Sequence, residues 1–250
     1  MKMRFLLLVL VTLVASSCTT TVRHKADYQS SLSGGHNQSL ILPPAVEVNI
    51  VDLAVKKERL YDYEYHLENI ISQDLLIALE KQGLRAKILT RRNLHDQELT
   101  RDEAMMRERY VEIREKLYKK IEMNEKQAFN IDENVGPRAS LIGSKNDSSL
   151  LVILDYIRIS KTGGARTADF MMDAFLRTNK TDLADRVVIV VGLIEARTGN
   201  ILWTNLSSNE GGIFSSAIDK SSVEDKAEAK RIQGILANIF KPLEKDNKKN

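Results

Sequence analysis

VVIVVGLIEARTGNILW, residues 187–203, is the stretch that decides the fold. Its first eight residues are apolar on both faces of an extended chain, which is typical of a central strand covered on each side. Residues 197–200 (RTGN) predict a tight turn, because Gly199 can adopt positive φ. Residues 201–203 then begin a second strand. The stretch therefore predicts a β-hairpin in the middle of a sheet.

The rest of the chain supplies further strands and the helices that cover them. A strand apolar on both faces is predicted at 150–159, and alternating strands are predicted at 46–50 and 84–88. A helix at 59–82 separates the last two, and a terminal helix carries an apolar face. The fold class predicted is α/β (α+β), with a mixed sheet of about five strands and packing helices. The apolar face of the terminal helix comprises Ile232, Ile235, Leu236, Ile239, Phe240 and Leu243.

A long charged helix is predicted as an insertion near 100–129. Thr100 and Glu103 fit a capping box at its start. Two interpretations of its narrow apolar stripe stay open: the stripe faces the core of the domain, or it packs on a partner or a neighbouring subunit. The polar stretch 130–148 is interpreted as a loop. The stripe consists of Met106, Tyr110, Ile113, Leu117 and Ile121.

The N-terminus has the pattern of an export signal. A cationic start and an apolar run of roughly ten residues precede small residues, whereas a membrane-spanning helix needs about 20. The sequence Ala15-Ser16-Ser17-Cys18 resembles the bacterial lipobox, and Cys18 is the one cysteine of the chain. The resemblance implies a diacylglycerol with acyl chains such as palmitate on Cys18, and cleavage of residues 1–17. The alternative is an ordinary secretory signal with a chance cysteine.

The mature chain divides into a tether, one domain and a tail. Residues 18–40 are rich in Ser, Thr, Gly and Asn and predict a flexible tether. Residues 41–243 form the predicted domain, and residues 244–250 a polar tail. Loss of Lys2 and Arg4 with the signal lowers the formal net charge from +3 to +1. This near-neutral balance offers no field for nucleic acid. The partners expected, the membrane and other envelope proteins, are those that the resemblance to lipoproteins implies.

No catalytic motif stands out, and neither a cofactor nor a metal site is predicted. Asp155 and Glu195 lie on predicted strands and would need the fold to bring them together. A polar-aromatic patch at the start of the first helix contains Tyr61, Tyr65 and His66. It is either an ordinary surface patch or a ligand- or glycan-binding face. The protein is therefore predicted not to be an enzyme.

The segment 160–185 joins two core strands and has two periodicities at once. It alternates as a strand does, yet Phe170 and Phe175 also share one side of a helix. It is interpreted as an edge hairpin or a short helix, or else as an oligomer contact or a hairpin that enters a membrane. Phe170 and Phe175 are candidate interaction residues, together with Trp203 of the hairpin.

The lipobox, the Pro43-Pro44 start of the first strand and the "RTG … ILW" hairpin at 197–203 together resemble a superfamily of outer-membrane lipoproteins. Its members include the curli secretion channel subunit (CsgG-like), the Pel-polysaccharide ring lipoprotein and the penicillin-binding-protein activator lipoprotein. The resemblance implies a lipid-anchored periplasmic domain at the outer membrane. It also implies a non-enzymatic role, as a homo-oligomer, in assembly or secretion of an envelope structure. The alternative is a regulator that activates a cell-wall enzyme such as a peptidoglycan synthase.

Overall fold

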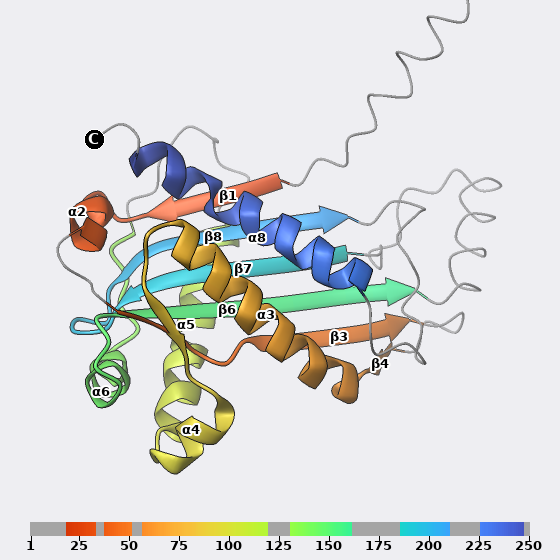
Figure 1. Cartoon of the computed structure of the whole chain (residues 1–250), viewed down its shortest axis with the longest axis horizontal. Helices are drawn as coiled ribbons and strands as arrows, with labels where there is room; N and C mark the ends of the chain where they lie inside the picture. The colour runs from red at the N-terminus through yellow and green to blue at the C-terminus, as the bar shows by residue number, and fades with distance from the viewer. Residues whose placement is uncertain are drawn as a thin grey trace, which may run out of the picture.

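A computed structural model describes residues 19–33, 38–51, 57–119, 131–161, 186–210 and 226–247. One sheet lies between two layers of helices (Figure 1), with α3 and α8 on one face and α4, α5 and α6 on the other. The predicted α/β class and mixed sheet are confirmed. The predicted count of about five strands is too low, because the described residues alone form a sheet of eight.

The sheet is built outward from its longest strand, β6 (Leu150–Lys161). On one side β7 (Arg186–Glu195) and β8 (Ile201–Glu210) form the predicted hairpin, and Gly199 has φ of 78° in its turn. The strand β1 (Thr19–His24) lies antiparallel to β8 and forms that edge. Parallel strands lie on the other side of β6. They are β2 (Ser39–Ile41) and β3 (Ala45–Val51), which are bordered in turn by β5 (Ala86–Ile88) and β4 (Lys57–Arg59).

Two prolines explain why β2 and β3 are separate strands along one edge of β6. Pro43 and Pro44 have no N–H to donate, so the ladder must pause there. The Leu42 N–H still donates to the Val152 carbonyl at 2.9 Å, and pairing resumes at Ala45. The Pro43 carbonyl accepts from Arg107 Nη2 of α5 at 2.7 Å. The break in the ladder is thus satisfied by a helix on the second face.

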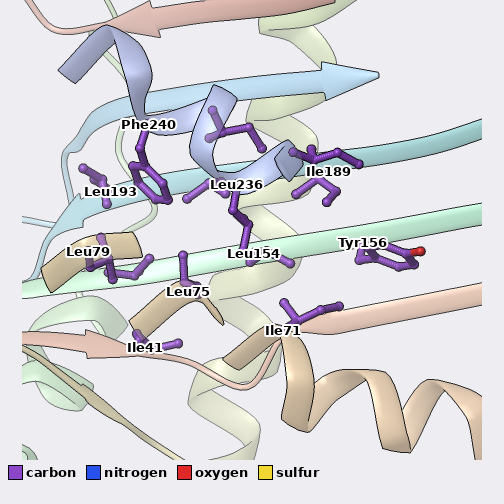
Figure 2. Packing of buried hydrophobic residues seen from close by; sticks show 14 of the residues in the cluster. Ile41, Ile71, Leu75, Leu79, Leu154, Tyr156, Ile189, Leu193, Leu236 and Phe240 are labelled. Atoms are coloured by element: carbon purple, nitrogen blue, oxygen red, sulfur yellow. The ribbon is translucent and has the colours of Figure 1, made fainter. Parts of the chain in front are cut away.

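The first face is covered by α3 (Tyr61–Lys81) and α8 (Lys226–Asn247). Figure 2 shows Leu75 and Leu79 of α3 with Leu236 and Phe240 of α8, packed over side chains of the sheet. Each buried leucine-sized side chain contributes roughly 1.5–3 kcal/mol of hydrophobic free energy. The predicted apolar face of the terminal helix is buried in full: Ile232, Ile235, Leu236, Ile239, Phe240 and Leu243.

The second face is covered by α5 (Thr100–Lys119), with α4 (Arg91–Asp96) and α6 (Arg138–Lys145) beside it. The stripe of α5 faces the core of the domain, since Met106, Tyr110 and Ile113 are buried against the sheet. Residues 120–129 of the predicted charged helix lie outside the described residues, and its origin as an insertion stays a prediction. The helix begins at Thr100, so Thr100 is not its cap. A capping box is found instead at Thr90, at the start of α4.

Three predicted segments differ from the structure. The predicted flexible tether, 18–40, contains β1, a helix α2 (Tyr28–Ser33) and β2. The predicted loop 130–148 contains α6. The predicted polar tail overlaps the last turn of α8, which continues to Asn247. Strand pairing orders β1 and β2, and Ala139 and Ile142 bury one side of α6, although these stretches lack a strong periodicity of their own.

Candidate functional site

Several chain segments meet at one end of the sheet, which we call the proximal end. The strand β1 begins there, because Thr19 pairs with Ser208 near the end of β8. The strands β3 and β6 end there, since Val51 pairs with Lys161. In Figure 1 the proximal end is on the right, where the arrowheads of β3, β6 and β8 lie. The chain that precedes Thr19 therefore joins the domain at this end.

The polar-aromatic patch also lies at the proximal end, at the start of α3. Tyr61 is 68% exposed and Tyr65 is 69% exposed, whereas His66 is half-buried. The Arg59 guanidinium lies over the Tyr61 ring, 5.0 Å from its centroid. The three predicted residues of this patch therefore lie within the first two turns of α3, with the two tyrosines exposed.

An ion pair fixes the backbone beneath the patch. Arg59 Nε donates to Glu64 Oε1 at 2.8 Å, and Arg59 Nη2 donates to Glu64 Oε2 at 3.0 Å. The hydrogen bond to Glu64 raises the pKa of the Arg59 guanidinium. The Val48 N–H donates to Glu64 Oε1 at 2.9 Å, so the same carboxylate joins α3 to β3. The first turn of α3 is therefore held in a fixed position relative to the sheet.

A buried charged cluster lies inside the proximal end, between β6 and α8. Arg158 Nη1 is 2.6 Å from Glu228 Oε2, and both side chains are almost wholly buried. The Tyr156 hydroxyl donates to the other oxygen of Glu228, and Arg231 lies 3.6 Å from the carboxylate. Burial, followed by the charge of Glu228, raises the pKa of the Tyr156 phenol well above its ordinary value. Both partners of the ion pair are almost wholly buried, and the cluster joins the first turn of α8 to β6.

A second charged cluster lies on the opposite face, around Asp155. Arg107 Nη1 donates to Asp155 Oδ1 at 2.8 Å, and Arg114 donates to Oδ2. Arg107 also pairs with Glu103 at 2.7 Å. Asp155 is not brought to Glu195: in the register of β6 and β7, Asp155 pairs with Val190 and Glu195 with Leu150. The sequence alone could not decide whether these two carboxylates form a pair, and the structure shows that they are separated.

The other predicted site residues have different outcomes. Trp203, a candidate interaction residue, is 0% exposed and stacks on Phe240 with 5.8 Å between ring centroids, so in this structure it is a residue of the core. Cys18, Phe170 and Phe175 lie outside the described residues. Within the described ranges, no three His, Cys, Asp or Glu side chains are grouped to hold a metal ion. No helix in this part of the chain is long and apolar enough to cross a bilayer.

Sequence reasoning missed β1 and the Arg158–Glu228 cluster. A signal for the cluster existed, because Arg158 stands in the middle of an apolar strand and a charge there needs a buried partner. Its partner lies 70 residues further on, at the start of a helix, and only the fold identifies it.

Comparisons with known proteins give distant likenesses. No protein-family model and no curated protein matches the sequence. Among solved structures, the chain is similar to the PelC dodecamer from Paraburkholderia phytofirmans. The identity is 9%, the TM-score is 0.39, and the match covers 91% of this chain and 97% of that chain. It is also similar to lipoprotein GNA1162 from Neisseria meningitidis, with 11% identity, a TM-score of 0.34, and coverage of 82% and 97%. Likeness at this level establishes neither a common family nor a function.

Proposed function

We propose that the protein is a lipoprotein held on the outer membrane by lipid on Cys18, with a non-enzymatic role in assembly or secretion of an envelope structure. The observation that carries the proposal is the order of features at the N-terminus. An apolar signal is followed by the lone cysteine, and β1 begins at the next residue, Thr19. A cysteine at this place serves attachment, because with no second cysteine it cannot form an internal disulfide.

The position of β1 supports a close attachment. With no tether between Cys18 and β1, the acyl chains would hold the proximal end of the sheet at the membrane surface. More than one acyl chain is needed for firm binding, which is what a lipobox implies. Tyr61 and Tyr65 are exposed at that end. Tyrosine suits a membrane–water interface because its ring is apolar and its hydroxyl is polar.

The non-enzymatic part of the proposal is supported by the two clusters of buried charged groups around Asp155 and Glu228. The buried carboxylates Asp155 and Glu228 are each bound by arginines and serve packing between sheet and helices. A general acid or base needs access to a substrate proton, whereas these two side chains are almost wholly buried. Assembly as a homo-oligomer belongs to the same proposal, and the mass of the detergent-extracted protein tests it.

Replacement of the lipid attachment point tests the anchoring. We expect wild-type protein to incorporate labelled palmitate and to stay in the membrane fraction until detergent extracts it. Cys18→Ser protein should incorporate no palmitate and should leave the membrane fraction without detergent. Thr19→Ser is the matched control, since it keeps both Cys18 and the backbone of β1. An unchanged membrane fraction and palmitate signal in Cys18→Ser would overturn the proposal.

A further inference from the structure

A groove of about 290 Å³ lies between α3 and α8 on the outer side of the first face. Its floor includes Leu236 and Phe240 of α8, which are buried side chains of the core. Figure 2 shows both side chains between α8 and the sheet. Ile77 of α3 stands at the groove and is 47% exposed, one of the few large apolar side chains exposed to solvent in the described chain. The groove is therefore apolar at its floor and at one wall.

One carboxylate of this groove is incompletely satisfied. Asp74 of α3 is 8% exposed, and its Oδ1 accepts a 2.9 Å hydrogen bond from Gln233 Nε2 of α8. Its Oδ2 is buried and has no hydrogen-bond partner. Among the described residues no ion pair reaches Asp74, although Lys81 lines the same groove. Such a buried oxygen normally has a donor, because leaving it unpaired costs about 1–3 kcal/mol.

The carboxylate also opposes folding at neutral pH. Burial raises the pKa of Asp74, and the hydrogen bond from Gln233 offsets this only in part. The folded state therefore binds the proton of Asp74 more tightly than the unfolded state does. As the pH rises from below the ordinary pKa of an aspartate through the raised pKa of Asp74, ionisation of this residue progressively lowers the free energy of unfolding. A destabilising charge beside an open groove is typical of a binding residue rather than of a packing residue.

We propose that the groove between α3 and α8 is a docking site for a partner protein that inserts an arginine or lysine side chain toward Asp74. The volume accommodates one such side chain, whose aliphatic stem would pack on Leu236 and Phe240. Its cationic head would supply the donor that Asp74 Oδ2 lacks, and a charge-assisted bond is stronger than the amide bond from Gln233. Gln233 is exposed and can turn aside. An apolar neighbour on the partner would cover Ile77.

Small probes test the charge requirement directly. Benzamidine joins an amidinium to an apolar ring, and benzamide has the same shape without the charge. We expect the purified detergent-solubilised lipoprotein to bind benzamidine saturably in ligand-observed NMR, and to bind benzamide about tenfold more weakly or less. Asp74→Asn should weaken benzamidine binding about tenfold. Glu80→Gln, an equal charge change on the exposed side of α3, should leave it unchanged. Binding that is absent, or equal in Asp74→Asn and wild type, overturns the proposal.

Thermal stability separates a binding role from a structural one. Asp74→Asn keeps the oxygen that accepts from Gln233 and removes the buried charge. We expect its Tm at pH 7 to rise by roughly 2–4 °C, and the gain to shrink as pH falls through the raised pKa of Asp74, because the wild-type side chain then loses its charge. Lys81 and Gln233 are the charged and polar side chains that line the groove beside Asp74. A lower Tm at pH 7 would make Asp74 a structural residue and contradict the proposal.

A photo-crosslinking residue at position 77 identifies the occupant in cells. We expect an adduct with a different protein, lost in Asp74→Asn and retained in Glu80→Gln. An adduct with the mass of two copies of this chain, or one indifferent to Asp74→Asn, would overturn the assignment.

Discussion

Because Gly192 has no side chain, the helix α5 can approach the sheet closely at this position. A Cβ built on Gly192 of β7 would lie 2.5 Å from the Tyr110 hydroxyl oxygen and 2.7 Å from two of its ring carbons. That hydroxyl lies 3.0 Å from Thr204 Oγ1 on the neighbouring strand. Burial raises the pKa of the Tyr110 phenol, which keeps the hydroxyl neutral. Tyr110 is thus enclosed by the backbone of β7 on one side and a hydrogen bond on the other.

We therefore predict that Gly192→Ala destabilises the protein. The methyl group would force the Tyr110 ring away from the sheet, and overpacking of this kind costs about 1–3 kcal/mol. Urea unfolding followed by circular dichroism measures the loss. Gly234→Ala in α8 is the control: its Cβ would meet nothing within 4 Å. Since alanine favours a helix over glycine by about 0.8–1.0 kcal/mol, that variant should be more stable than wild type. An unchanged midpoint for Gly192→Ala would show that the ring moves without cost.

At the scale of elements, α8 is joined to β6 by a buried ion pair as well as by apolar contacts. Arg158 and Glu228 are 2% and 3% exposed, and Glu228 lies in the first turn of the helix. Water cannot screen such a pair, so removing one partner leaves the other charge buried. The position of the start of α8 therefore depends on both residues together.

This dependence predicts a non-additive result. Arg158→Met should cost about 3–5 kcal/mol, whereas adding Glu228→Met to it should cost little more or restore stability. Denaturant unfolding of the two single variants and the double variant gives the coupling energy. The exposed pair Arg92–Asp96 is the control, and its cycle should give less than about 0.5 kcal/mol. Additive costs at Arg158 and Glu228 would contradict the prediction.

The elements that were predicted correctly from the sequence are those whose own residues show a strong hydrophobic pattern. The strands β6 and β7 are apolar on both faces, and α3 and α8 carry apolar residues at helical spacing. The strand β1 has the sequence TTTVRH, whose polar composition is that of a loop, and only its pairing with β8 makes it a strand. The helix α6 is a short element held against the sheet by Ala139 and Ile142. Local pattern cannot reveal elements that tertiary contacts create.

For the candidate site too, some residues could be predicted from the sequence and others could not. Exposed aromatic residues at a helix start, Tyr61 and Tyr65, were recognisable from sequence because they belong to a dense polar-aromatic patch. Trp203 was predicted as a candidate interaction residue, yet it pairs with Leu193 and stacks on Phe240 of α8 in the core. A tryptophan at the start of a strand does not indicate which face of the sheet it occupies, because a one-residue shift of register reverses the face. The β-bulge between Leu193 and Ile194 is such an irregularity, and sequence did not predict it.

For the molecule as a whole, the loss of the predicted tether changes what a lipid on Cys18 would do. A flexible tether would let the domain turn freely, whereas β1 directly after Cys18 would hold the proximal end at the membrane. A ten-residue strand is roughly 33 Å long. The opposite end of the sheet, where α6 packs before β6 begins, should therefore stand well away from the lipid.

A single label on the anchored protein tests this orientation. The lipid-linked Cys18 would not react with thiol reagents, so Tyr65→Cys and Leu141→Cys each provide one reactive thiol, at the proximal end and on α6. In vesicles with quencher-bearing lipids, we expect fluorophores at position 65 to be quenched several-fold more than those at 141. Insertion of fifteen Gly/Ser residues between Cys18 and Thr19 adds a chain with a mean span of about 20 Å, so the difference should shrink. Equal quenching without the insertion would mean that β1 does not orient the domain. Absence of the protein from the vesicles would instead reject the lipid anchor, so the two ideas fail separately.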